Sequence, residues 1–134
     1  KSYHPIFSRF KIKKLEIKKD ILENRVKKLE ELRELSSYLK EDLTRYYSYS
    51  KIKENTKLYE NLVKINELSK IWGENEKLTK AIIKFIFFAG EIIDEYEHYG
   101  RFESMDRDET INKLNNSFRE LIKEIEKEEK RLLK

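Results

Sequence analysis

The chain has 134 residues, the size of one domain, and 42% of them are charged while 38% are hydrophobic. It contains no cysteine, which excludes disulfides, thiolate zinc sites and thiol nucleophiles. The formal net charge is +4, but segment 1–28 has ten basic and three acidic residues and is therefore +7, so the rest of the chain carries −3.

The front of the chain, residues 1–14 (KSYHPIFSRFKIKK), is basic and aromatic, and we expect it to form an arm ahead of one helical-bundle domain at 15–134. Cations that contact phosphates and rings that stack on exposed bases hold single-stranded nucleic acid with little sequence preference. The candidate phosphate contacts here and in the next turns are Arg9, Lys11, Lys13, Lys14, Lys18 and Lys19, and the stacking candidates are Tyr3, Phe7 and Phe10. A solvated helix end with its aromatic side chains packed on the domain is the alternative interpretation.

The first helix is predicted to begin near Lys11, because apolar residues then recur at steps of three or four, as on one helical face. These residues are Leu15, Leu22, Val26, Leu29, Leu32, Leu35, Leu39 and Leu43. Lys18 and Lys19 interrupt the stripe, so we expect the N-terminal turns to extend beyond the core with their basic faces free. The tyrosine-rich segment 46–49 predicts a packed corner after this helix.

A second helix is predicted from about Lys51 to Trp72, with Gly73 as the C′ residue that ends it. The third helix should begin after Asn75, whose side chain suits an N-cap, and should end at Gly100. This helix is apolar on nearly every side, which predicts the central and most buried element.

The last helix is predicted to open near Ser104 or Asp108, where several acidic residues favour the positive end of a helix dipole. Its inner face would be formed by Ile111, Leu114, Phe118, Leu121, Ile125 and Leu132. The sequence therefore predicts an all-α protein, a four- or five-helix bundle with a basic N-terminal arm.

The sequence offers few groups for catalysis or metal binding. Glu95 and His98 have the i, i+3 spacing used by di-iron helical bundles, with Glu91 one turn earlier. Such a site needs a second pair of this kind, and the only other histidine is His4 in the arm. No serine and aspartate are linked by sequence to either histidine, and Gly-rich phosphate loops are absent. We therefore expect a protein that is not an enzyme and that has no cofactor and no metal site.

Three short segments within residues 48–125 can be compared, in their order, with the motifs of a known family. YSKIK at 49–53 is followed by FIFFAGE at 85–91 and by ETINK at 109–113, which continues to FRELI at 118–122. In this order they resemble the small helical subunit of type III-A CRISPR effector complexes, which carries a segment like Leu-Thr-Thr-Ser-x-Ile-Arg, an apolar helix with Tyr-x-Ala-Gly-Arg, and a final amphipathic helix. Lysine and glutamate stand at 53 and 91, where the family has arginines, so position 91 should not contact a phosphate here.

The resemblance implies an architectural role, in which several copies stack along the complex and line the groove for guide and target RNA while other subunits cut. It implies backbone contacts on the body from Lys51, Lys53, Lys113 and Arg119. We therefore expect a non-enzymatic, RNA-binding structural subunit of a multi-subunit ribonucleoprotein in the cytoplasm. Its partners would be nucleic acid, copies of itself and other subunits of the assembly.

Two other functions stay open. A basic aromatic arm before a helical bundle would also suit the packaging of duplex DNA inside a virus particle, as in a coat protein of an archaeal filamentous virus. The bundle could instead bind only proteins, with its stripe from Leu22 to Leu43 pairing with a partner helix. A membrane span is not expected, because the longest apolar run, 81–93, is short and interrupted by Lys84 and Glu91. Abundant Lys, Glu and Ile without Gln is a compositional hint of a thermophile.

Overall fold

The computed structural model describes the backbone of residues 4–49, 57–99 and 107–134, and the side chains within 16–45, 57–98 and 108–134. Every regular element in these ranges is helical, which confirms the predicted all-α class. The elements are α1 (His4–Tyr49), α2 (Leu58–Ser69), the 3-10 helix η1 (Lys70–Trp72), α3 (Glu76–Tyr99) and α4 (Arg107–Leu132). The four α-helices pack as a bundle, so the coarse fold follows the prediction.

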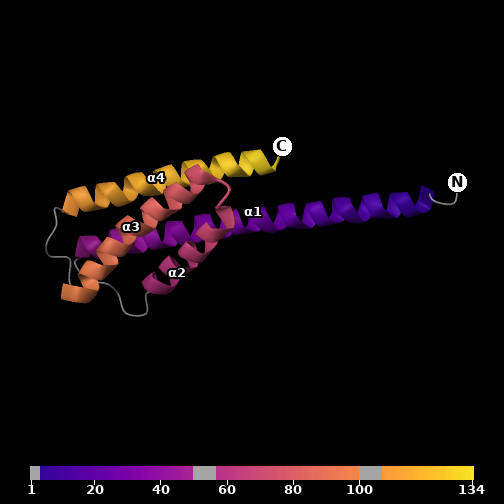
Figure 1. The fold of residues 1–134 in the computed structure, drawn as a ribbon. Helices are drawn as coiled ribbons and strands as arrows, with labels where there is room; N and C mark the ends of the chain where they lie inside the picture. The colour runs from indigo at the N-terminus through magenta and orange to yellow at the C-terminus, as the bar shows by residue number, and fades with distance from the viewer. Residues whose placement is uncertain (1–3, 50–56, 100–106) are drawn as a thin grey trace.

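Each helix packs against the next one along the chain, and α4 returns to lie beside α1 (Figure 1). The first and last helices run in opposite directions, and the α2–α3 hairpin covers one side of them (Figure 1). Apolar side chains from all four helices meet in one core, which contains Trp72 and Phe85 as its largest fully buried members. The core residues that α1 supplies are Leu29, Leu32, Leu39 and Leu43.

Helix α1 begins at His4, earlier than the predicted start near Lys11. Proline is tolerated in the first turn of a helix, where its missing N–H has no partner to lose, so Pro5 does not prevent the earlier start. The backbone of 4–14 is therefore continuous with the helix. A boundary near residue 14 between an arm and a bundle domain stays a prediction.

The connection between α2 and α3 differs in part from the prediction. Helix α2 begins at Leu58 and passes into η1, whereas the predicted start near Lys51 lies outside the described residues. Gly73 has φ −56° and ψ −29°, a right-handed conformation, so it does not act as the left-handed C′ residue that was expected. The N-cap prediction is confirmed, because the backbone N–H of Leu78 donates to Asn75 Oδ1 at 3.1 Å.

Helix α3 is less completely buried than its composition predicted. It contributes seven buried apolar residues to the core, but Ile83 and Phe87 are 55% and 59% exposed. The reason is that α3 has neighbours on its inner face only, so apolar residues on its outer face remain in solvent. Helix α4 follows its predicted stripe, since Leu114, Leu121 and Ile125 are buried and the others pack partly against the core.

Candidate nucleic-acid interface

The N-terminal part of α1 extends well beyond the other helices (Figure 1). We call residues 16–24 the projecting segment; their side chains are exposed apart from the half-buried Leu22. From Leu29 onward the same helix is buried in the bundle, which we call the body. The predicted extension of the N-terminal turns beyond the core is thus confirmed for the described residues.

Three lysines at or near the projecting segment face solvent. Lys18 and Lys27 are exposed and make no ion pair with any part of the chain that the structure describes. Lys19 is 74% exposed, and its Nζ lies 4.0 Å from Glu23 Oε1, a surface pair at the limit of contact. Exposed pairs of this kind contribute about 0–1 kcal/mol and are screened by salt, so Lys19 can exchange Glu23 for another anion at little cost.

Two other cations of the basic front are held by the protein's own acids. Arg25 Nη2 lies 2.7 Å from Glu74 Oε1, and Lys28 Nζ lies 3.4 Å from Glu31 Oε2. The net charge of +7 therefore overstates what this end of the molecule offers to a polyanion. Within the described front, the cations that are both exposed and least closely paired are Lys18, Lys19 and Lys27.

The remaining predicted contacts fall into two groups. The side chains of Tyr3, Phe7, Phe10, Arg9, Lys11, Lys13, Lys14, Lys51 and Lys53 lie outside the described residues. The other two are on α4: Lys113 Nζ pairs with Glu109 Oε1 at 3.2 Å, while Arg119 is exposed and has no ion pair within the described ranges.

The structure does not bring the α4 cations together with those of the projecting segment. Lys40 of α1 lies over the ring of Phe118, with its Nζ 5.5 Å from the ring centroid, so Arg119 lies level with that part of α1. Lys18 lies much earlier in α1, roughly 33 Å away at about 1.5 Å per helical residue. The body and the projecting segment would therefore contact different stretches of any polymer.

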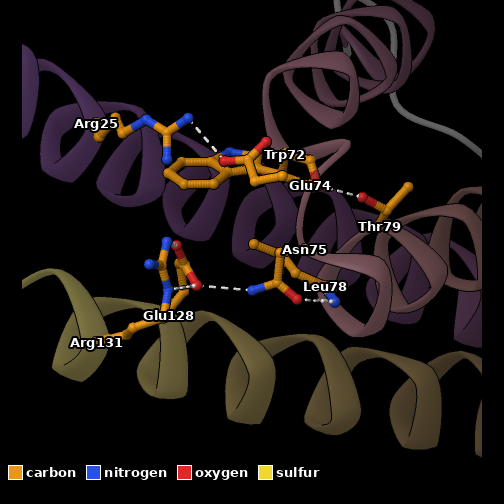
Figure 2. A network of polar contacts seen from close by, with 8 residues as sticks. All are labelled: Arg25, Trp72, Glu74, Asn75, Leu78, Thr79, Glu128 and Arg131. Carbon is orange, nitrogen blue, oxygen red and sulfur yellow. Dashed lines mark hydrogen bonds and ion pairs between the residues drawn. The ribbon is translucent and has the colours of Figure 1, made fainter.

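A network of polar contacts fixes the point where α1 leaves the body (Figure 2). Besides its ion pair to Glu74, Arg25 places its guanidinium 5.2 Å from the ring of Trp72, a cation–π contact. The backbone O of Trp72 accepts a hydrogen bond from Thr79 Oγ1 at 2.6 Å. Arg25 of α1 is thus attached to the turn between α2 and α3.

The same turn is attached to α4. Asn75 Nδ2 donates to Glu128 Oε2 at 2.7 Å, and Arg131 donates to both carboxylate oxygens of Glu128, with Nε at 2.9 Å from Oε2 (Figure 2). Glu128 is buried, so these donors replace the water that its charge would otherwise need. Three elements of the body therefore meet at the base of the projecting segment.

Both acids of the network are held in the charged form. The hydrogen bonds from Arg131, followed by the one from Asn75, lower the carboxyl pKa of Glu128 against the opposing effect of burial. The pKa of Glu74 is also lowered, first by a hydrogen bond from its own backbone N–H and then by Arg25. These ion pairs persist at neutral pH and stiffen the base of the projecting segment.

Sequence reasoning missed this network. Arg25 entered the prediction only as one of the ten basic residues of segment 1–28, and Trp72 only as the last residue of the second predicted helix. The i, i+3 spacing of Glu128 and Arg131 could have predicted their pairing. Asn75 and Glu128 are 53 positions apart, and no local signal joins them.

The described residues show no cluster of groups for metal binding, since no three His, Asp or Glu side chains in these ranges converge. Glu91 and His98, examined above as candidate ligands, are exposed on α3, and Glu95 is buried. None of the helices in the described part of the chain combines the length and apolar character needed to cross a bilayer.

Comparison of the chain with protein-family models, with curated proteins and with solved structures found no match.

Proposed function

We propose that the chain is a non-enzymatic RNA-binding structural subunit of a multi-subunit ribonucleoprotein. The observation that carries this proposal is the projecting segment of α1, which presents Lys18 and Lys19, with Lys27 at its base, to solvent. The resemblance to the small helical subunit of type III-A CRISPR effector complexes favours guide and target RNA as the polymer.

The expected contact is with the phosphate backbone. Each lysine placed on a phosphate releases condensed counterions, so affinity falls as salt rises. A segment that stands clear of the body can approach a strand from several sides, because no neighbouring helix covers it. The network around Arg25 supports this role by holding the base of the segment in one orientation.

The test is the affinity for single-stranded RNA, measured by fluorescence anisotropy between 50 and 200 mM salt, the range over which phosphate contacts are lost. The variant carries Lys18→Ala, Lys19→Ala and Lys27→Ala. Because each single-strand contact contributes about 0.7 to the slope of log affinity against log salt, we expect this slope to decrease by roughly 2.

The matched control carries Lys70→Ala, Lys77→Ala and Lys123→Ala, three exposed lysines of the body that form no ion pair in the described structure. It removes the same charge but should keep most of the affinity and the slope. A wild-type chain that binds RNA equally at both salt concentrations, or equal losses in the two variants, would contradict the proposal.

Duplex DNA in the same assay distinguishes the packaging alternative. Basic helices can hold a duplex through its backbone without reading bases. We expect RNA to bind more tightly than a duplex DNA of equal length. Tighter binding of duplex DNA through the same three lysines would assign the projecting segment to DNA packaging instead.

A further inference from the structure

Exposed apolar side chains gather on the outer face of the hairpin formed by α2 and α3. On α2, Tyr59 and Val63 are 52% and 45% exposed, and on α3 Ile83 and Phe87 are 55% and 59% exposed. Each pair is spaced i, i+4 and therefore forms a stripe along one side of its helix. Single exposed apolar residues are normal, but two neighbouring stripes of them need an explanation. None of the four side chains belongs to the core of the chain.

The two stripes lie on either side of the line along which α2 and α3 meet. A Cβ atom added to Gly90 would lie 3.9 Å from Leu62 Cδ2, so this line passes through these two residues. Val63 follows Leu62 directly, and Phe87 precedes Gly90 by three residues, almost one helical turn. Since both side chains are exposed, they lie on the outward side of the contact and border a shallow groove between the helices.

Gly90 forms the floor of this groove, and the packing of the described residues does not require a glycine there. An added Cβ would make only an ordinary contact with Leu62, and no other described side chain would lie within 4 Å of it. Glycine in the middle of a helix is less stable than alanine, because it loses more conformational freedom on folding. What glycine provides at this position is room for the backbone of another molecule to come close.

On α2, the apolar stripe borders a hollow that is open to solvent. The hollow is lined by Tyr59, Glu60, Val63, Lys64 and Glu67. Its two glutamates and its lysine are exposed and form no ion pair in the described ranges. The lining of the hollow therefore carries a net charge of −1.

On α3, the exposed face adds two more acids. Glu91 and Asp94 follow Phe87 by four and seven residues, so they lie on its face of the helix, and neither forms an ion pair in the described ranges. The one lysine of segment 83–94, Lys84, is bound to Glu120 of α4 at 3.1 Å. Segments 58–69 and 83–94 together contain four acids and two lysines, which leaves four unpaired acids against one unpaired lysine, a charge of −3.

This surface suits neither RNA nor the projecting segment of another copy. Its unpaired carboxylates repel phosphates. The projecting segment, 16–24, has three acids and two lysines, a net charge of −1, so its own exposed pair, Ile17 and Ile21, brings no complementary charge. The groove is complemented instead by an apolar stripe that has basic residues beside it.

We propose that the outer face of the α2–α3 hairpin binds an amphipathic helix of a different protein, one that carries lysine or arginine beside its apolar stripe. Two helices side by side form a groove into which the side-chain ridges of a third helix can pack. The partner's apolar residues, spaced i, i+3, i+4 and i+7, would contact Val63 and Phe87 across the open floor at Gly90. Its basic residues would pair with the carboxylates on both rims. This docking goes beyond the proposed RNA binding and shares no residue with it.

The probe is a fluorescently labelled helical peptide of about 18 residues, five turns, with leucine along one face and lysine elsewhere. A second peptide keeps the leucines and has glutamate in place of lysine. We expect the leucine–lysine peptide to bind the wild type with a micromolar dissociation constant in fluorescence anisotropy. The leucine–glutamate peptide should bind at least about 10-fold more weakly, because like charges would face each other on the rims.

The first variant tests the apolar contact. It carries Val63→Gln and Phe87→Gln, both at exposed positions, so the fold should persist, which circular dichroism can verify. We expect it to bind the leucine–lysine peptide about 10-fold more weakly than the wild type does. The matched control carries Tyr38→Gln and Leu133→Gln, two exposed apolar residues on α1 and beyond the end of α4, and should bind normally.

The second variant fills the floor of the groove. Gly90→Leu places a side chain between the two stripes, and leucine favours a helix more than glycine does. The unfolding temperature should therefore stay the same or rise, while the affinity for the leucine–lysine peptide falls by about 10-fold. A loss of affinity without a loss of stability cannot be attributed to misfolding.

The third variant tests the rims. Glu60→Gln with Glu67→Gln should weaken binding of the leucine–lysine peptide several-fold at low salt and less at high salt, because salt screens exposed charges. Glu34→Gln with Glu126→Gln is the matched control, at exposed acids of α1 and α4 that form no ion pair in the described structure. It removes the same charge and should leave the affinity almost unchanged.

Three results would overturn the proposal: no binding of the leucine–lysine peptide, equal affinities of the wild type and the three variants, or equal binding of the two peptides. Sedimentation velocity of the wild type alone tests the other occupant. Oligomers that Val63→Gln with Phe87→Gln abolishes would assign the groove to a second copy and overturn the proposal as well. The variant with Lys18, Lys19 and Lys27 replaced should bind the peptide normally, so a failure of RNA binding and a failure of docking are separate results.

Discussion

The two halves of helix α1 have similar apolar spacing and opposite environments. In the body, Leu32 and Leu39 are completely buried by the other helices. In the projecting segment, Ile17 and Ile21 are four residues apart, which also keeps them on one helical face, but they are more than half exposed. The difference teaches that periodicity predicts which face of a helix is apolar, but does not tell whether that face is covered by the same chain.

The charged neighbours of the two stripes explain part of this difference. Lys18 and Arg25 lie on the same side of α1 that carries the buried leucines in the body. Burying a lysine charge costs much more free energy than leaving it in water. In the body, the polar residue on this side of α1 is the small Ser36, which is buried among the leucines. The body can therefore close around the second half of the helix only.

The largest expected effect comes from truncating one apolar residue in each half. Leu32→Ala should lower the free energy of unfolding by about 2–5 kcal/mol, because it leaves a cavity in the core. Ile21→Ala should change it by about 0.5 kcal/mol or less, since the side chain is mostly in water. Urea denaturation at low protein concentration measures both, and equal losses would show that the projecting segment packs against the body.

A smaller effect should come from Glu128, which belongs to the network at the junction of the two regions. Glu128→Gln removes the charge that Arg131 and Asn75 stabilise, and should lower the free energy of unfolding at neutral pH by about 1–3 kcal/mol. Glu126→Gln, at an exposed acid with no ion pair in the described ranges, is the control and should have little effect.

The pH dependence gives a second measurement on the same pair of variants. The pKa of Glu128 is lowered from the usual 4.5, so its contribution is complete above that value and is lost as the pH falls through the lowered pKa. The stabilities of the wild type and Glu128→Gln should therefore converge in acid. A difference that stays constant with pH would mean that the charge of Glu128 is not what stabilises the junction.

The smallest of these effects is expected at Arg25. Arg25→Ala removes the contact with the Trp72 ring and the ion pair with Glu74, which together should contribute about 1 kcal/mol. Lys27→Ala, two residues further along and without an ion pair in the described structure, should leave stability unchanged. Equal unfolding midpoints for the two variants would show that Arg25 does not attach the projecting segment to the body.

The parts of the fold that rest on local signals could be predicted from the sequence. The N-cap at Asn75 and the inner face of α4 were found because a short polar side chain before a helix and an apolar spacing of three or four are local features. The early start of α1 was missed because the regular apolar spacing begins only after Lys11, whereas the helix itself begins at His4 with Pro5 in its first turn. The exposed Phe87 was missed because composition cannot show how many neighbours a helix has.

The candidate interface could also be predicted only where local signals decide it. Lys18 and Lys19 were expected to be exposed because they interrupt an apolar stripe, and the structure confirms this. The pairing of Arg25 with Glu74 could not be predicted, since it depends on how the turn after α2 folds back onto α1. The alternative in which the leucine stripe pairs with a partner helix is wrong for Leu29 and Leu32. Both side chains are completely buried in the chain's own core and cannot contact a partner.

Trp72 gives the molecule a built-in optical reporter. It is the single tryptophan of the chain, it is completely buried, and the guanidinium of Arg25 lies over its ring at the base of the projecting segment. A charge beside an indole shifts its emission, so any partner that tilts the helix will alter the signal from this one side chain. Binding of a partner to the projecting segment can therefore be followed through Trp72 fluorescence, without a label.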